Sequence, residues 1–118
     1  MKEKLHPVLS VRIFGEEKCF GPGIAELLRR VDRHHSLRAA AKSMGMAYSK
    51  AWSITKKAEA GLGFPLLIVQ TGGKNGGGAA LTEDAVRLLR AYDSYCAKIR
   101  AYADAVYETD FSFLNEIK

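Results

Sequence analysis

Hydrophobic side chains recur at helical spacing in the first half of the chain and predict three consecutive helices. The first opens at Gly21-Pro22, because proline is well tolerated at the first helical position, and ends near residue 34. Ser36 is an N-cap for a second helix over residues 37–44, and a third helix runs from residue 48 to about residue 60. The residues predicted to face inward are Ile24, Leu27, Leu28, Val31, Leu37, Ala40, Ala41, Met44, Ala51, Trp52, Thr55 and either Ala58 or Glu59.

Two other stretches have the patterns of strands. Residues 9–13 alternate apolar and polar positions, residues 15–18 form a turn, and Cys19-Phe20 return, which predicts a short hairpin. Residues 66–70 are strand-like, a glycine-rich run follows, and residues 79–81 can return. We therefore expect a second hairpin with a flexible tip.

A long helix is predicted at the end of the chain. Thr82 caps it, and it runs to about residue 108, a length of roughly 40 Å at 1.5 Å per residue. Its apolar residues recur every seven positions, so the stripe either packs lengthwise against the domain or pairs with a second copy, as in a coiled coil. Its length favours a homodimer, formed through Leu88, Tyr92, Tyr95, Ile99, Tyr102 and Val106.

The length and composition fit one small globular unit. At 118 residues, with 47% hydrophobic and 26% charged residues, the chain suits a single modest core. We expect a mainly α fold with a small β-hairpin, in which residues 1–81 form the domain and residues 82–118 add the long helix and a short tail. Apolar runs stay shorter than the ~20 residues of a membrane span, and the N-terminus lacks the apolar core of a secretion signal. We therefore expect a cytoplasmic protein with no membrane partner.

Positive charge is concentrated in the first half of the chain. The net charge is +5; residues 1–62 hold 12 Lys and Arg against 6 Asp and Glu, whereas residues 63–118 hold 6 against 7. This asymmetry points to a polyanionic partner.

The sequence offers no pattern of an enzyme. The stretch TGGKNGGGAALT (residues 71–82) lacks the spacing of a nucleotide-binding loop, since Asn75 follows Gly73-Lys74 and Ile68 stands at the position of the first glycine. Cys19 and Cys96 are far apart and are interpreted as buried thiols. We find no nucleophile with its base, no paired carboxylates and no metal-ligand spacing, so we expect no catalytic site, metal or cofactor.

Residues 36–58 carry the clearest functional pattern. Two short helices meet through a glycine turn, an arrangement typical of the helix-turn-helix of DNA-binding proteins, although an ordinary helix pair with a basic face would look similar. The third helix presents donors and cations that suit base edges and phosphates. A hairpin after a helix-turn-helix is a wing, whose tip can meet a DNA backbone, unless it is only a loose turn. The residues expected at DNA are Ser36, Arg38, Tyr48, Ser49, Lys50, Ser53, Lys56, Lys57, Thr71, Lys74 and Asn75.

Three motifs together resemble a known family. Phe20-Gly21-Pro22-Gly23, the run AAAKSMGMAYSKAW at residues 39–52 and the glycine-rich stretch at residues 71–82 resemble the N-terminal DNA-binding domain of ModE-type molybdate-responsive transcription regulators. That domain is itself similar to the winged helix-turn-helix of LysR-type regulators. The resemblance covers roughly residues 12–95 and implies a winged helix-turn-helix with a long C-terminal dimerisation helix, in a prokaryotic regulator.

The resemblance also implies how the protein meets DNA. A homodimer would place the third helix in the major groove, with Tyr48, Ser49, Lys50 and Ser53 as readers, while the wing contacts the flanking backbone. Trp52 matches an inward tryptophan of the family and is expected in the core. Ala47 and Ile24 stand where relatives often have Ser and Arg, so Ala47 removes a possible hydroxyl contact.

Two expectations concern partners. Full-length ModE regulators carry molybdate-binding domains after the long helix, and residues 109–118 are too few for one, so we expect no molybdate binding by this chain. The alternative to double-stranded DNA as partner is a protein that docks on the same face. The clustered lysines 50, 56, 57 and 74 favour DNA, because a docking surface for protein would be more apolar.

Overall fold

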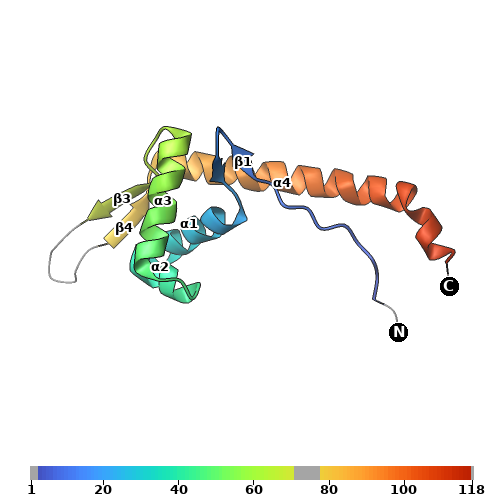
Figure 1. The fold of residues 1–118 in the computed structure, drawn as a ribbon, viewed down its shortest axis with the longest axis horizontal. Helices are drawn as coiled ribbons and strands as arrows, with labels where there is room; N and C mark the ends of the chain where they lie inside the picture. Colours follow the sequence, from blue (N-terminus) through green and yellow to red (C-terminus); the bar gives the residue numbers. More distant parts are fainter. Residues whose placement is uncertain (1–2, 71–77, 118) are drawn as a thin grey trace.

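The chain forms four helices, two short hairpins and a final 3-10 turn within residues 3–70 and 78–117, the part that the computed structural model describes (Figure 1). This confirms the predicted fold class, a winged helix-turn-helix followed by a long helix. Helices α3 and α4 each end two residues later than predicted. The elements are β1 (Ile13–Phe14), β2 (Lys18–Phe20), α1 (Pro22–His34), α2 (Leu37–Ser43), α3 (Tyr48–Leu62), β3 (Leu67–Gln70), β4 (Gly78–Leu81), α4 (Glu83–Asp110) and the 3-10 turn η1 (Ser112–Asn115).

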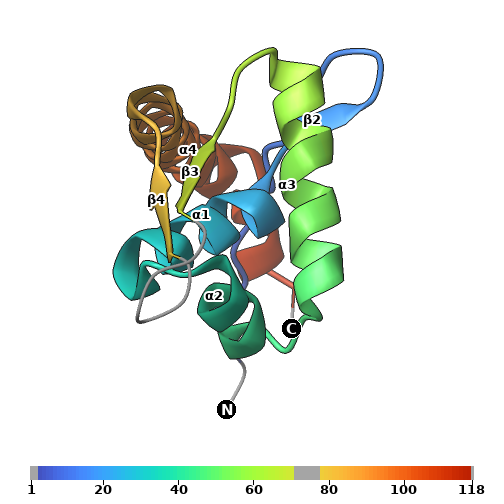
Figure 2. The same ribbon diagram turned by 90° about the vertical axis from the view of Figure 1, so that its left-hand side faces the viewer.

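Helix α1 lies at the centre of the hydrophobic core, between α3 and the wing strands in Figure 2. Its apolar face is buried as predicted, at Ile24, Leu27, Leu28 and Val31. Strand β2 adds Phe20, whose side chain is 0% exposed and meets the ring of Tyr92 in α4 edge to face, with centroids 5.0 Å apart. The Phe20–Tyr92 pair therefore attaches the long helix to the core.

The connection between α2 and α3 follows from local chemistry. Ser36 caps α2, as predicted, because its Oγ accepts a hydrogen bond from the Ala39 N–H at 3.0 Å. Gly45 ends the turn after α2 with a φ of +68°, a left-handed conformation that glycine adopts without a steric penalty. The Met46 N–H then donates to the Ala41 carbonyl at 2.9 Å. These bonds fix the angle at which α3 leaves α2.

The first hairpin is shorter than the sequence suggests. The alternating residues 9–13 were expected to form a half-buried strand, but β1 contains only Ile13 and Phe14. The preceding residues run extended beneath the long helix α4 (Figure 1), and the Val11 carbonyl accepts a hydrogen bond from the Tyr92 hydroxyl at 2.7 Å. Of the apolar residues in this segment only Val11 is half-buried, whereas Leu9 and Ile13 are exposed, so the predicted half-buried strand is not present.

Helix α4 projects away from the core and gives the molecule its extents of 64 × 33 × 21 Å. The start of its apolar stripe is buried at Ala85 and Tyr92, whereas Tyr95 and Tyr102 are 56% and 73% exposed. Ile99 and Val106 are half-buried. The helix thus packs on the core of its own domain near its start, while the N-terminal segment runs alongside its later part, where Ile99 and Val106 are only partly covered. Among the described residues, no helix is both long enough and apolar enough to cross a membrane.

Candidate nucleic-acid interface

The outer face of α3 is held in place by small side chains on its inner face. Ala51, Thr55 and Ala58 are buried, and the Thr55 hydroxyl donates to the Ala51 carbonyl at 2.9 Å, which satisfies its polar group inside the helix. Alanine and threonine allow α3 to approach α1 and α2 closely. The predicted reader residues lie on the outside and are all exposed: Tyr48, Ser49, Lys50 and Ser53.

Trp52 corrects the sequence-based expectation. It was predicted to face the core, but its side chain is 37% exposed. On α3 it lies four residues after Tyr48 and one after the buried Ala51, so it sits at the edge of the inner face. The buried face of α3 is formed by Ala51, Thr55 and Ala58, with Ile54 and Leu62 partly buried beside them, and Trp52 lies outside this set. Trp52 therefore belongs to the exposed surface that carries the reader residues.

Four side chains form a continuous stack along this edge, which we call the cation–aromatic ladder: Arg38, Tyr48, Trp52 and Lys56. The Arg38 guanidinium lies 4.3 Å from the centroid of the Tyr48 ring, and the Lys56 ammonium lies 4.5 Å from that of Trp52. The two rings are stacked at 24° with centroids 6.5 Å apart. The ladder connects α2 to α3 and holds two of the predicted DNA-binding cations in fixed places.

The ladder ends at a carboxylate that joins α3 to the wing. Glu59 accepts hydrogen bonds from the Leu66 N–H at 2.7 Å and the Leu67 N–H at 3.4 Å, and it pairs with Lys56 at 3.2 Å. Burial alone would raise the pKa of Glu59, but the bonds from Leu66, Lys56 and Leu67 outweigh it and hold this pKa below its ordinary value. The ionised carboxylate thus fixes the start of β3 against the third helix.

Replacing Glu59 by glutamine is expected to destabilise the protein by about 1–2 kcal/mol at pH 7, because charge-assisted bonds become neutral ones. A carboxyl whose pKa is lowered by folding stabilises the native state above its unfolded pKa, and this stabilisation is lost as pH falls through the folded value. The difference from the parent should therefore shrink below about pH 4.3. Urea unfolding of the parent and of Glu59→Gln at several pH values measures this difference in the free energy of unfolding. As a control, Glu17→Gln removes only an exposed pair with Lys57, so it should change stability by less than about 0.5 kcal/mol; equal effects of both changes at pH 7 would contradict the role of Glu59.

The remaining residues predicted to contact DNA differ in whether their polar groups are already engaged within the protein. The Ser36 hydroxyl caps α2, so its oxygen is already engaged by the protein backbone. Lys57 is exposed and lies 3.7 Å from the Glu17 carboxylate of the first hairpin, while Arg38 and Lys56 lie in the ladder. Thr71, Lys74 and Asn75 lie outside the described residues, so their placement stays a prediction.

The base of the wing is fixed to the rest of the domain at both ends. The Ala79 N–H of β4 donates to the His35 carbonyl, at the junction of α1 and α2, over 3.0 Å. At the other end the Thr82 hydroxyl donates to the Pro65 carbonyl at 2.8 Å and accepts from the Ala85 N–H at 3.1 Å, as the predicted cap of α4. Strands β3 and β4 pair antiparallel, with Leu67 opposite Leu81 and Gln70 opposite Gly78. The hairpin is therefore directed by the same elements that position α3.

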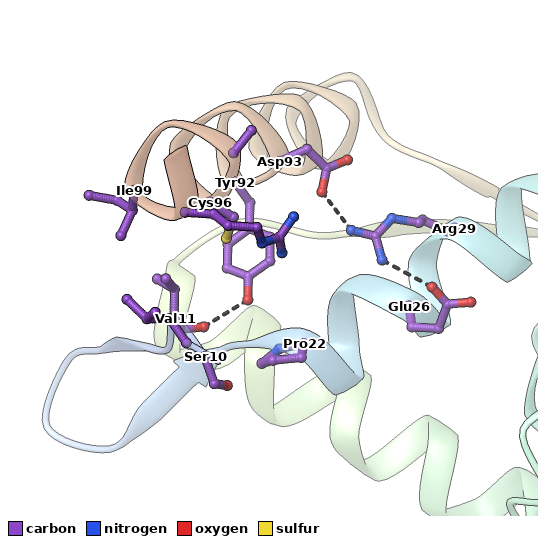
Figure 3. Close-up of a pocket in the computed structure, with 12 residues that line it drawn as sticks. Ser10, Val11, Pro22, Glu26, Arg29, Tyr92, Asp93, Cys96 and Ile99 are labelled. Atoms are coloured by element: carbon purple, nitrogen blue, oxygen red, sulfur yellow. Dashed lines mark hydrogen bonds and ion pairs between the residues drawn. The ribbon is translucent and has the colours of Figure 1, made fainter. Parts of the chain in front are cut away.

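A separate cleft of about 560 Å³ lies between α1, α4 and the N-terminal segment (Figure 3). Three of its charged groups form ion pairs: Arg29 pairs with Glu26 of α1 and with Asp93 of α4. Hydrogen bonds from Arg30 and Arg29 hold the pKa of Glu26 below its ordinary value. Since Arg29 is engaged by two carboxylates, these ion pairs serve to fasten α4 to α1, while Arg100 of α4 also lines the cleft.

The two cysteines differ in burial. Cys19 is buried, as predicted, whereas Cys96, which was also interpreted as a buried thiol, is half-buried.

Tyr92 was predicted to contact a second copy, but it is buried in the core of its own domain. Its ring packs against Phe20, and its hydroxyl donates a hydrogen bond to the Val11 carbonyl. The other residues of that set lie along α4 and are half-buried or exposed: Leu88, Tyr95, Ile99, Tyr102 and Val106. Among the described residues, no three His, Cys, Asp or Glu side chains are grouped to hold a metal ion.

The helix-turn-helix with its wing and its exposed basic helix defines a DNA-binding transcription regulator. Residues 25–86 match the family described as "Bacterial regulatory helix-turn-helix protein, lysR family", and the chain belongs to this family. The expected resemblance to ModE-type regulators is confirmed by the relatives that it matches.

The relatives share the N-terminal part of much longer proteins. The chain is 42% identical over 72 residues to "Transcriptional regulator ModE" of Haemophilus influenzae, a match of 61% of this chain and 28% of the relative. It is 30% identical over 103 residues to "DNA-binding transcriptional dual regulator ModE" of Escherichia coli K12, covering 86% and 39% respectively. It is 38% identical over 66 residues to "Molybdenum-pterin-binding protein MopB" of Rhodobacter capsulatus, covering 56% and 24%. The chain therefore spans between a quarter and two fifths of these proteins.

Proposed function

We propose that the protein binds specific duplex DNA sequences as a homodimer, with α3 in the major groove and the wing on the flanking backbone. The observation that carries this proposal is the outer face of α3, where Ser49, Lys50 and Ser53 are exposed while the small residues opposite them are buried. Short hydroxyls and a lysine at the start of a protruding helix suit base edges and phosphates. In this proposal DNA binding needs no molybdate, so adding molybdate leaves the affinity unchanged.

Selection from random double-stranded DNA by the purified protein, followed by sequencing, tests this proposal. A two-fold symmetric motif, with half-sites about 34–36 Å apart or a multiple of that distance, is the expected result. The affinity for the selected site should fall with salt by a log–log slope of about −0.9 for each phosphate neutralised. Retention without a motif would contradict sequence-specific recognition. If no duplex is retained even at low salt, the same face would instead be a docking surface for another protein.

The homodimer rests on the free part of the α4 stripe. Tyr95 and Tyr102 are exposed and Ile99 lies between them in sequence, half-buried. A second copy that covered these residues would remove large apolar surfaces from water, in the way that coiled-coil helices do. The two α3 helices of such a dimer would then be held at a fixed separation, which a two-fold symmetric site requires.

Replacing Ile99 by glutamate is expected to dissociate the dimer and leave the domain folded, because Ile99 is only half-buried at the edge of the cleft beside the N-terminal segment and is not part of the hydrophobic core. Sedimentation at micromolar concentration measures the mass, and circular dichroism measures the folding. Ala101→Glu places the same charge on the exposed side of the helix and should leave the dimer intact. A parent protein that sediments as a monomer at this concentration would overturn the proposed dimer.

A further inference from the structure

Trp52 is a large apolar side chain that lies outside the hydrophobic core. The residue is 37% exposed, and the neighbouring residues on the inner face of α3 are Ala51 and Thr55. It is also fixed, since Tyr48 stacks on it and the Lys56 ammonium lies 4.5 Å from its ring centroid. A rigid, partly exposed aromatic surface on a basic helix is suited to contact with a partner, because little side-chain freedom is lost on binding.

The residues around Trp52 indicate which chemical group of a DNA partner the indole would contact. The exposed residues beside it on α3, Ser49, Lys50 and Ser53, can make hydrogen bonds to base edges, whereas the indole offers mainly an apolar surface. In the major groove the apolar group that bases present is the 5-methyl of thymine. The Arg38 guanidinium adds positive charge at the Tyr48 end of the aromatic pair, where it can neutralise a phosphate, whereas Lys56 at the other end is paired with Glu59 and holds the indole in place.

We infer that Trp52 is a specificity-determining residue that reads thymine by contact with its 5-methyl group, held in position by the cation–aromatic ladder. This inference rests on the proposed function, since it requires α3 to enter the major groove. It adds a residue that the sequence pattern assigned to the core, and it predicts that each half-site contains a thymine whose methyl group contributes to binding.

Replacing thymine by deoxyuridine isolates the methyl group, because the hydrogen-bonding edge of the base is unchanged. Each thymine of the selected site is replaced in turn, and the affinities of the parent and of Trp52→Ala are measured. For the parent, one position in each half-site should lose about fourfold in affinity, the value of one methyl group. Trp52→Ala should bind the unmodified site more weakly and should be insensitive to the replacement at that position. Trp52→Phe, which keeps an aromatic ring, should retain part of the sensitivity.

A fluorescence titration and a control variant provide two further tests of the contact between Trp52 and thymine. Trp52 is the single tryptophan of the chain, so its fluorescence in the unaltered protein should change on binding the thymine site and change less with the deoxyuridine site. Phe14→Ala removes an exposed aromatic side chain from the first hairpin, outside the proposed DNA and dimer surfaces, and should leave the sensitivity to deoxyuridine unchanged.

The possible failures are distinguishable. Equal losses for the parent and Trp52→Ala at every thymine would overturn the inference and leave the proposed function standing, as would a selected motif with no fixed thymine. A uniform loss of affinity in Trp52→Ala without a change in thymine sensitivity would show that Trp52 only positions Arg38 and Lys56. If the parent retains no duplex, the proposed function itself fails and the inference falls with it.

Discussion

Replacing Lys50 and Lys74 together by alanine is expected to abolish measurable binding to duplex DNA at moderate salt. Lys50 is exposed in the first turn of α3, and Lys74 belongs to the glycine-rich stretch after β3. On the proposed geometry Lys50 acts from the reading helix and Lys74 from the wing; if each neutralises one phosphate, the salt slope should fall by about 3.6 in a dimer and by about 1.8 in a monomer. Titration of a labelled duplex over a range of salt concentrations measures both the affinity and the slope.

The matched control removes the same charge from elsewhere on the chain. Lys4→Ala with Lys98→Ala also lowers the net charge by two; both lysines are exposed, Lys4 in the N-terminal segment and Lys98 in α4, outside the helix-turn-helix and the wing. This variant should keep nearly the full affinity and the full salt slope. If the two double variants weaken binding equally, net charge alone explains the interaction and the assigned face is wrong. Binding by Lys50→Ala/Lys74→Ala as tight as that of the parent would also reject this face.

Replacing Phe20 by alanine is expected to have the largest effect on stability, a loss of about 3–5 kcal/mol in the free energy of unfolding. Phe20 is completely buried, and its ring packs against Tyr92 of α4, so its removal leaves a cavity at the point where the long helix joins the core. Since domains of this size are stable by only about 5–15 kcal/mol, the variant should be close to unfolding. Guanidinium unfolding at one fixed protein concentration measures the change.

Phe14 provides a control within the same hairpin. It lies in β1, and its side chain is 63% exposed, so Phe14→Ala deletes the same atoms without opening a cavity. We expect this change to alter stability by no more than about 0.5 kcal/mol. Similar losses in the free energy of unfolding for the two variants would show that the hairpin is stabilised as a unit. The contact between Phe20 and Tyr92 would then contribute no more than the exposed Phe14 ring.

The helices were predictable because their signals are local. Gly21-Pro22, Ser36 and Thr82 each act on neighbouring backbone groups, and the spacing of apolar residues reports which face is buried. These features do not depend on parts of the chain that are distant in sequence. The bounds of α1 and, to within one residue at its end, of α2 were therefore accessible from the sequence, together with the strands of the wing hairpin.

The features that the sequence did not reveal depend on distant parts of the chain. Whether Trp52 enters the core is decided by how close α3 lies to its neighbours, and periodicity does not measure that distance. The bonds from Leu66 and Leu67 to Glu59 join a side chain to backbone groups beyond a turn, which leaves no periodic signal. The contact between the segment before β1 and α4 joins residues 81 positions apart, at Val11 and Tyr92. One sign of the Trp52 placement was present: small residues at positions 51, 55 and 58 already define a complete inner face.

The small inner face of α3 has a consequence for how such a protein can change over generations. Ala51, Thr55 and Ala58 hold the helix in place, while Ser49, Lys50 and Ser53 project outward and contribute little to the core. Mutations at the outward positions can therefore alter the preferred sequence at little cost to folding. A duplicated gene could acquire a new set of targets through a few such changes, with its scaffold intact throughout.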